Sequence, residues 1–165
     1  MTMVKIGVLS DTHLPDSGEA MAFLAALAQH CFADVDMIIH AGDVVAPEIL
    51  AAFGDIPVHA VRGNMDPAVS DIPVRKIVGV KGFRIGMIHG WGTAKGLEKR
   101  LLAEFASDRI DCLVFGHSHS PICEVKDGVL LFNPGSATDR RSAPSHTVGI
   151  LEIDSEIRGR IVSLD

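Results

Sequence analysis

Seven residues that can bind a metal ion stand at the ends of short hydrophobic segments in this sequence. They are Asp11, His13, Asp43, Asn64, His89, His117 and His119. All of them offer nitrogen or oxygen ligands and none a thiolate, which suits Mn, Fe, Ni or Zn better than Cu(I) or an iron–sulfur centre. We expect Asp43 to lie at the centre of the site, because its two carboxylate oxygens can hold two metal ions together.

The hydrophobic segments before these residues have the pattern of buried strands. Strands are predicted over residues 4–9, 36–41, 58–61, 83–89 and 111–115. Each is a brief apolar run that ends at Gly, Asp, Asn or His, which is typical of strands covered on both faces. Because ligand residues follow the carboxyl ends of all these strands, the sequence predicts one shared site at one edge of a sheet.

The rest of the chain supplies helices and further strands. Helices are predicted over residues 19–30, 47–53 and 93–105, and strands over residues 75–80, 129–132, 147–153 and 159–164. Strands alternate with helices in the first part, and strands alone fill the last part. This order predicts an α/β protein with a mixed sheet, or two stacked sheets, and outer helices. With no repeat or linker in 165 residues, we expect a single domain over residues 1–165.

Charge and hydropathy exclude several classes of function. A net charge of −6 and a pI near 5.7 argue against stable binding of nucleic acid, which needs a basic surface. The longest uncharged stretch lies between Glu19 and Asp34 and is shorter than the roughly 20 apolar residues of a membrane span. Strand-like sequence begins by Val4, which leaves no room for a signal peptide. We expect a cytoplasmic protein, and assembly into a homo-oligomer stays open.

The motifs Asp-x-His, Gly-Asp, Gly-Asn, His and Gly-His-x-His follow one another in this order. In this combination the chain resembles the calcineurin-like metallophosphoesterases, and among them the small single-domain phosphodiesterases. The resemblance extends from Asp11 to at least the turn Asn133-Pro134-Gly135-Ser136. It implies two stacked mixed β-sheets flanked by helices, an αββα sandwich, with the metal site at the carboxyl ends of the strands.

The resemblance also implies how the ligands are divided between two metal ions. One ion is assigned to Asp11, His13 and His119, the other to Asn64, His89 and His117, with Asp43 between them. Mn²⁺ is the expected metal, with Fe, Ni or Zn as alternatives. Two ions about 3.5–4 Å apart can share a hydroxide that attacks phosphorus. We therefore expect a phosphodiesterase that hydrolyses small phosphodiesters.

One position departs from the family pattern. Many relatives have a histidine after Gly-Asn that is cast as the acid for the leaving group, whereas this chain has Met65, which has no proton to donate. Asp66 or a water on the metal can take that role, although holding the turn before Pro67 is the simpler role for Asp66. The predicted catalytic residues are Asp43, Asn64, Asp66 and His89.

Two other functions stay open, a phosphatase for small monoesters or nucleotides and a non-catalytic scaffold like the eukaryotic retromer subunit of this fold. The complete ligand set argues against the scaffold, because in that subunit the metal site is degraded. Among neighbouring residues, His40 is expected to support the ligands rather than bind metal. Trp91 can stack on a base or an aryl leaving group, although packing within its loop is the simpler role.

Overall fold

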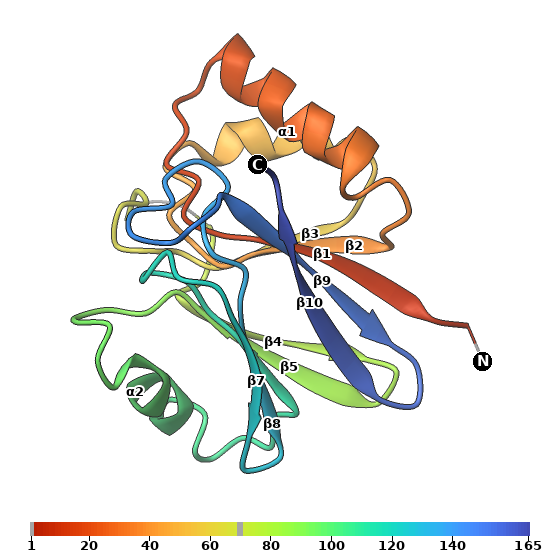
Figure 1. Ribbon diagram of the computed structural model, residues 1–165, viewed down its shortest axis with the longest axis vertical. Coiled ribbons are helices and arrows are strands. Elements are labelled where there is room, and N and C mark those ends of the chain that lie inside the picture. The colour runs from red at the N-terminus through yellow and green to blue at the C-terminus, as the bar shows by residue number, and fades with distance from the viewer. Residues whose placement is uncertain (1, 69–70) are drawn as a thin grey trace.

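The computed structural model describes residues 2–68 and 71–165, and its centre is a pair of five-stranded mixed sheets (Figure 1). The first sheet has the order β10-β9-β1-β2-β3. Its strands are β1 (Val4–Leu9), β2 (Met37–His40), β3 (Val58–Ala60), β9 (Thr147–Ile153) and β10 (Ile157–Ser163). The strands β1, β2 and β3 are parallel, so their carboxyl ends lie at one edge of the sheet.

The second sheet has the order β4-β5-β6-β8-β7. Its strands are β4 (Arg75–Val80), β5 (Phe83–Ile88), β6 (Cys112–Val114), β7 (Ile122–Lys126) and β8 (Val129–Asn133). The strands β5, β6 and β8 run parallel, with β4 and β7 antiparallel at the two edges. The two predicted stacked sheets are therefore confirmed.

Helices cover the outer faces of both sheets (Figure 1). They are α1 (Gly18–His30), the 3₁₀-helix η1 (Pro47–Phe53) and α2 (Leu97–Ala103). Helices α1 and η1 share a buried cluster with the first sheet, and α2 shares another with the second. The arrangement is the αββα sandwich that the resemblance implied. Within residues 2–68 and 71–165, no helix has the length and apolar character to span a membrane.

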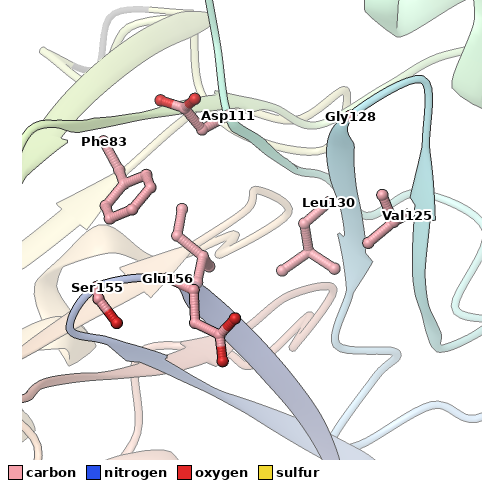
Figure 2. A pocket seen from close by; sticks show the side chains of 8 residues that line it. Phe83, Asp111, Val125, Gly128, Leu130, Ser155 and Glu156 are labelled. Atoms are coloured by element: carbon pink, nitrogen blue, oxygen red, sulfur yellow. The ribbon is translucent and has the colours of Figure 1, made fainter.

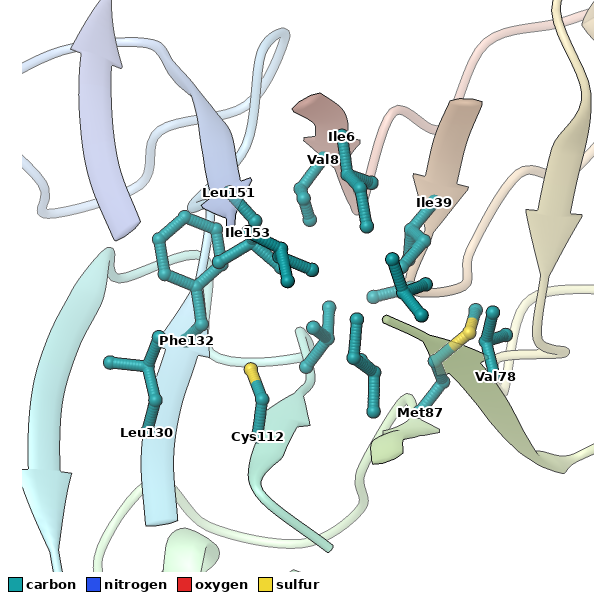
Figure 3. Close-up of a cluster of buried hydrophobic side chains, with 14 of the residues drawn as sticks. Ile6, Val8, Ile39, Val78, Met87, Cys112, Leu130, Phe132, Leu151 and Ile153 are labelled. Atoms are coloured by element: carbon teal, nitrogen blue, oxygen red, sulfur yellow. The ribbon is translucent and has the colours of Figure 1, made fainter. Parts of the chain in front are cut away.

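The main core lies between the sheets and follows the alternation of side chains along each strand. Ile6 and Val8 of β1 face the second sheet, where Met87 of β5 belongs to the same cluster (Figure 3). Between them, Gly7 faces the helical layer, and a Cβ there would lie 2.7 Å from the ring of Phe32. Both faces of β1 are thus buried, and this packing holds the strand and the ligand loop that follows it in place.

The predicted helix over residues 93–105 is wrong at its start, because α2 begins only at Leu97. Gly96 has a left-handed φ of 74°, which a right-handed helix does not contain. The helix therefore starts only after this residue. The preceding loop is held by Arg100, whose guanidinium donates to the carbonyls of Trp91, Thr93 and Lys95. Residues 91–96 therefore form a braced loop at the site edge of the sheet, just after β5.

One strand was not predicted. Strand β7 is an exposed edge strand whose pattern lacks buried residues, so hydrophobic periodicity does not reveal it. It pairs antiparallel with β8 through the turn at Asp127 and Gly128, which have φ values of 52° and 80°. An Asp-Gly pair between two extended runs is a strong hairpin signal and is the feature that would have found this strand.

Candidate metal centre

Five of the seven predicted ligands meet at the carboxyl edge of the sheets. Two groups each keep their ligand atoms within 4.8 Å of one another, and they are Asp11, His13 and His119, and Asp11, Asp43 and His89. The carboxylate of Asp43 lies between the groups, because its Oδ2 is 3.5 Å from Nε2 of His13 and 3.2 Å from Nε2 of His89. Asp11 is common to both groups, so two carboxylates join the two halves of the site.

Four ligand atoms at this point are buried without a hydrogen-bond partner among the described residues, namely Asp11 Oδ1, His13 Nε2, His89 Nε2 and His119 Nε2. Asp11 Oδ1 lies 3.4 Å from His119 Nε2 and 3.6 Å from His89 Nε2, so these atoms face one another. An unpaired buried polar atom costs about 1–3 kcal/mol, and native structures contain few of them. Divalent cations held at the two groups would satisfy these atoms, so the residues present fit metal ions.

In two of the histidine ligands, a hydrogen bond made by Nδ1 determines that Nε2 is the nitrogen that faces the site. Nδ1 of His89 donates to the carbonyl of Ala41 at 2.8 Å, and Nδ1 of His119 donates to the carbonyl of Asp139 at 2.5 Å. Each ring then carries its proton on Nδ1 and presents the lone pair of Nε2 to the site. Backbone carbonyls commonly orient metal-binding histidines in this way.

The charges at the site favour cation binding. Burial raises the pKa of the Asp11 carboxyl, but the rings of His119 and His89 and the Ser10 hydroxyl together bring it below its ordinary value. Burial also raises the pKa of the Asp43 carboxyl, but its interactions with His89 outweigh burial and bring that pKa below its ordinary value. Both carboxyls are therefore ionised, and they leave negative charge in a buried position that a divalent ion would neutralise.

The backbone at the ligand positions is strained. The residues in the left-handed region are Asp11, His13, Asp43, His117 and His119, with φ values of 53°, 47°, 56°, 70° and 60°. This region is uncommon for residues other than glycine, and such strain persists where the surroundings hold it and a functional site uses it. These left-handed residues follow β1, β2 and β6, where the chain turns away from the strand at the site.

A turn that follows β8 holds two of the ligand loops in place. The Asn133 amide donates to the Gly116 carbonyl at 3.2 Å and to the Ser118 hydroxyl at 3.1 Å. The Ser136 hydroxyl donates to the Asp11 carbonyl at 2.8 Å. The turn at residues 133–136, found in the sequence through the resemblance alone, therefore ties the first ligand loop to the last.

The structure places His117 beside the two groups rather than within them. His117 packs against His89 with 5.4 Å between ring centroids, and its Nε2 donates to the Gly92 carbonyl at 2.8 Å, so Nδ1 is the nitrogen left for a metal. Asn64 is exposed and lines a pocket next to Gly63. The assignment of these two residues to the second metal ion stays a prediction.

Asp66 accepts hydrogen bonds from three backbone N–H groups, those of Asp43 at 2.9 Å, Val45 at 2.6 Å and Gly63 at 2.8 Å. These donors occupy both oxygens of the Asp66 carboxylate. The carboxylate joins the loop that carries Asp43 to the loop that carries Asn64. The geometry therefore supports a positioning role, and its predicted role as leaving-group acid has no support from these contacts.

His40 has the supporting role that was expected. It is fully buried, its Nδ1 accepts from the Gly42 N–H at 3.1 Å, and its Nε2 bonds the Thr12 hydroxyl at 3.0 Å. Burial lowers the pKa of the ring to about 4, so His40 is neutral at pH 7. It thus braces the two loops that carry the aspartate ligands.

A second hollow lies at the other end of the sandwich (Figure 2). It has a volume of about 190 Å³, and Phe83, Asp111 and Leu130 in its lining stand at the amino ends of β5, β6 and β8. The metal ligands follow the carboxyl ends of these sheets. This hollow therefore belongs to the opposite edge and adds no group to the metal centre.

Comparison with known families identifies the chain. Residues 4–156 match the family model of the calcineurin-like phosphoesterase superfamily domain. The chain belongs to this superfamily. It is 36% identical over 154 residues to a probable metallophosphoesterase of Methanothermobacter thermautotrophicus, an alignment that covers 92% of this chain and 87% of that one. It is 26% identical to a phosphodiesterase of Methanocaldococcus jannaschii, over 96% of this chain and 99% of the other.

Solved structures share the fold along the whole chain. A predicted phosphoesterase from Streptococcus pneumoniae superposes with a TM-score of 0.78 at 21% identity, covering 99% of this chain and 91% of that one. Vacuolar protein sorting 29 from Cryptosporidium parvum superposes with a TM-score of 0.68 at 20% identity, covering 99% and 98%. The fold is therefore shared by a predicted phosphoesterase and by a sorting protein.

Proposed function

We propose that this metallophosphoesterase is a phosphodiesterase that hydrolyses small phosphodiesters at a centre of two metal ions. The observation that carries the proposal is the set of four unpaired ligand atoms that converge at the strand ends. A metal-dependent hydrolase needs such a set to hold its ions, and without metal four unpaired buried ligand atoms would only cost stability. The set supports metal-dependent catalysis, while turnover is what separates an enzyme from a scaffold, because a vacuolar protein sorting 29 of the same fold has been solved with bound Zn²⁺.

Each residue at the site has a defined task in this proposal. Two divalent ions, when bound, supply the Lewis acidity that activates water and stabilises the charge developing at phosphorus. Asp43 keeps the two halves of the site in register, and Asp11 contributes to both groups. His89 and His119 are oriented by backbone carbonyls and hold their Nε2 atoms toward the ions. Asn64, as a neutral ligand, limits negative charge where an anionic substrate approaches.

The choice of diester over monoester is supported by the phosphodiesterase from M. jannaschii, which aligns along nearly the whole chain. We propose Mn²⁺ as the resident metal, with Fe, Ni or Zn as alternatives that the same nitrogen and oxygen ligands suit. A cytoplasmic location stays a prediction, as does assembly into a homo-oligomer.

Initial rates on two chromogenic substrates test the proposal. The protein is treated with a chelator, reloaded with Mn²⁺, and assayed with bis(4-nitrophenyl) phosphate and with 4-nitrophenyl phosphate. Metal-dependent turnover with the diester faster than the monoester supports the phosphodiesterase. A faster monoester reaction would favour a phosphatase instead. Stoichiometric metal without turnover of either substrate would favour the scaffold.

A further inference from the structure

A pocket of about 370 Å³ opens beside the metal centre. Its walls come from the loop after β3, which supplies Arg62, Asn64 and Asp66, and from the loop after β5, which supplies Gly90 and Trp91. Asn64 is a predicted metal ligand, and Gly90 directly follows the ligand His89 in the chain. The pocket is thus built from the two loops that carry the predicted ligands Asn64 and His89.

Large exposed hydrophobic side chains gather around this pocket. Of the four large exposed hydrophobic side chains in the described part of the chain, three lie on or next to these loops: Met65, Val74 and Trp91, which are 58%, 49% and 44% exposed. Val74 and Trp91 line the pocket itself. Exposed apolar groups gathered at one pocket indicate a ligand site rather than chance exposure.

The loop that carries Trp91 is held rigidly. Arg100 donates to the Trp91 carbonyl at 2.7 Å and to the Thr93 carbonyl at 2.5 Å, and the Gly92 carbonyl accepts from His117 at 2.8 Å. The indole therefore has a fixed backbone, while its ring stays partly exposed. An aromatic face that is already positioned binds a planar ring at little entropic cost.

We propose that this pocket binds an aromatic group attached to the phosphate of the substrate, with Trp91 as the stacking face. The inference depends on the phosphoester chemistry proposed for the metal centre, because the phosphate is what places the ring there. A volume of about 370 Å³ is at the low end of ligand pockets, so it suits one ring system. Arg62, held by a hydrogen bond to the Ala68 carbonyl at 2.9 Å, adds positive charge to the same wall.

Two matched pairs of phosphates test the proposal on the metal-loaded protein. Adenosine 5′-monophosphate is compared with ribose 5-phosphate, and phenyl phosphate with methyl phosphate, by calorimetry at low temperature. Stacking of one base contributes enough to predict about tenfold tighter binding for the aromatic member of a pair. Tighter binding of the aromatic member in the first pair alone identifies a nucleotide as the ligand. Tighter binding of the aromatic member in the second pair alone identifies an aryl ester.

Variants identify the residue responsible. Trp91→Ala should remove the preference, Trp91→Phe should keep most of it, and Val125→Ala, an exposed apolar residue on β7, should leave it unchanged. Because Trp91 is the single tryptophan of the chain, its fluorescence should also be quenched by adenosine 5′-monophosphate and not by ribose 5-phosphate.

Equal affinities within both pairs would overturn the proposal, as would an undiminished preference in Trp91→Ala. The hydrolysis assay with bis(4-nitrophenyl) phosphate separates this failure from that of the proposed function. Turnover without any aromatic preference removes only the pocket assignment. An aromatic preference without turnover removes only the catalytic assignment.

Discussion

Replacing Asp66 distinguishes a positioning role from an acid role. Its carboxylate accepts three backbone N–H bonds, and Asp66→Ala removes all of them. At about 1 kcal/mol net for each bond, the free energy of unfolding should fall by about 3 kcal/mol. Asp66→Asn keeps one acceptor oxygen and should cost about 1–2 kcal/mol. For a chain of 165 residues, each kcal/mol lowers the melting temperature by about 2–4 °C.

The assay combines thermal unfolding with hydrolysis of a series of diesters whose leaving groups differ in basicity. If Asp66 positions the loops of Asp43 and Asn64, Asp66→Asn should lower both the melting temperature and the rate on every substrate by a similar factor. If Asp66 protonates the leaving group, the loss of rate should instead grow with the basicity of the leaving group. This second pattern would refute the reasoning. Asp16→Asn, at an exposed carboxylate, serves as the control.

Three further predictions concern the metal centre and its support. Asp43→Asn should reduce turnover by at least a hundredfold and lower the bound metal while circular dichroism stays native, and near-wild-type turnover would contradict the bridging role. Gly116→Ala would place a Cβ 2.6 Å from Asp11 Oδ2 and should abolish metal binding, whereas Gly79→Ala, with no atom within 4 Å, should bind metal normally by elemental analysis. In chelator-treated protein, His40 should contribute stability that is complete above pH 6.5 and is lost as the pH falls toward 4, because the folded state lowers its pKa from 6.5 to about 4. Denaturant titrations should show that the free energy of unfolding falls by up to about 3 kcal/mol over this pH range. If the His40→Asn variant loses stability with falling pH in the same way as the wild type, the prediction is wrong.

Local pattern in the sequence predicted most of the strands and all five residues of the two metal groups. Both features are local, because an apolar run and the polar residue that ends it lie a few positions apart. Elements whose pattern is weak were less well predicted. The exposed strand β7 buries no side chain, and the start of α2 depends on a left-handed glycine and on contacts of Arg100.

The sequence by itself indicated which side chains can bind metal ions and that they follow the carboxyl ends of strands, whereas the structure brings these strand ends together from two sheets rather than one. The tertiary structure decided how each ring is turned, since the carbonyl that orients His89 lies 48 residues away and the one that orients His119 lies 20 residues away. It also gave Asp66 its three partners and formed the pocket at Trp91 from two separate loops. These features depend on contacts between distant segments, and no local periodicity encodes such contacts.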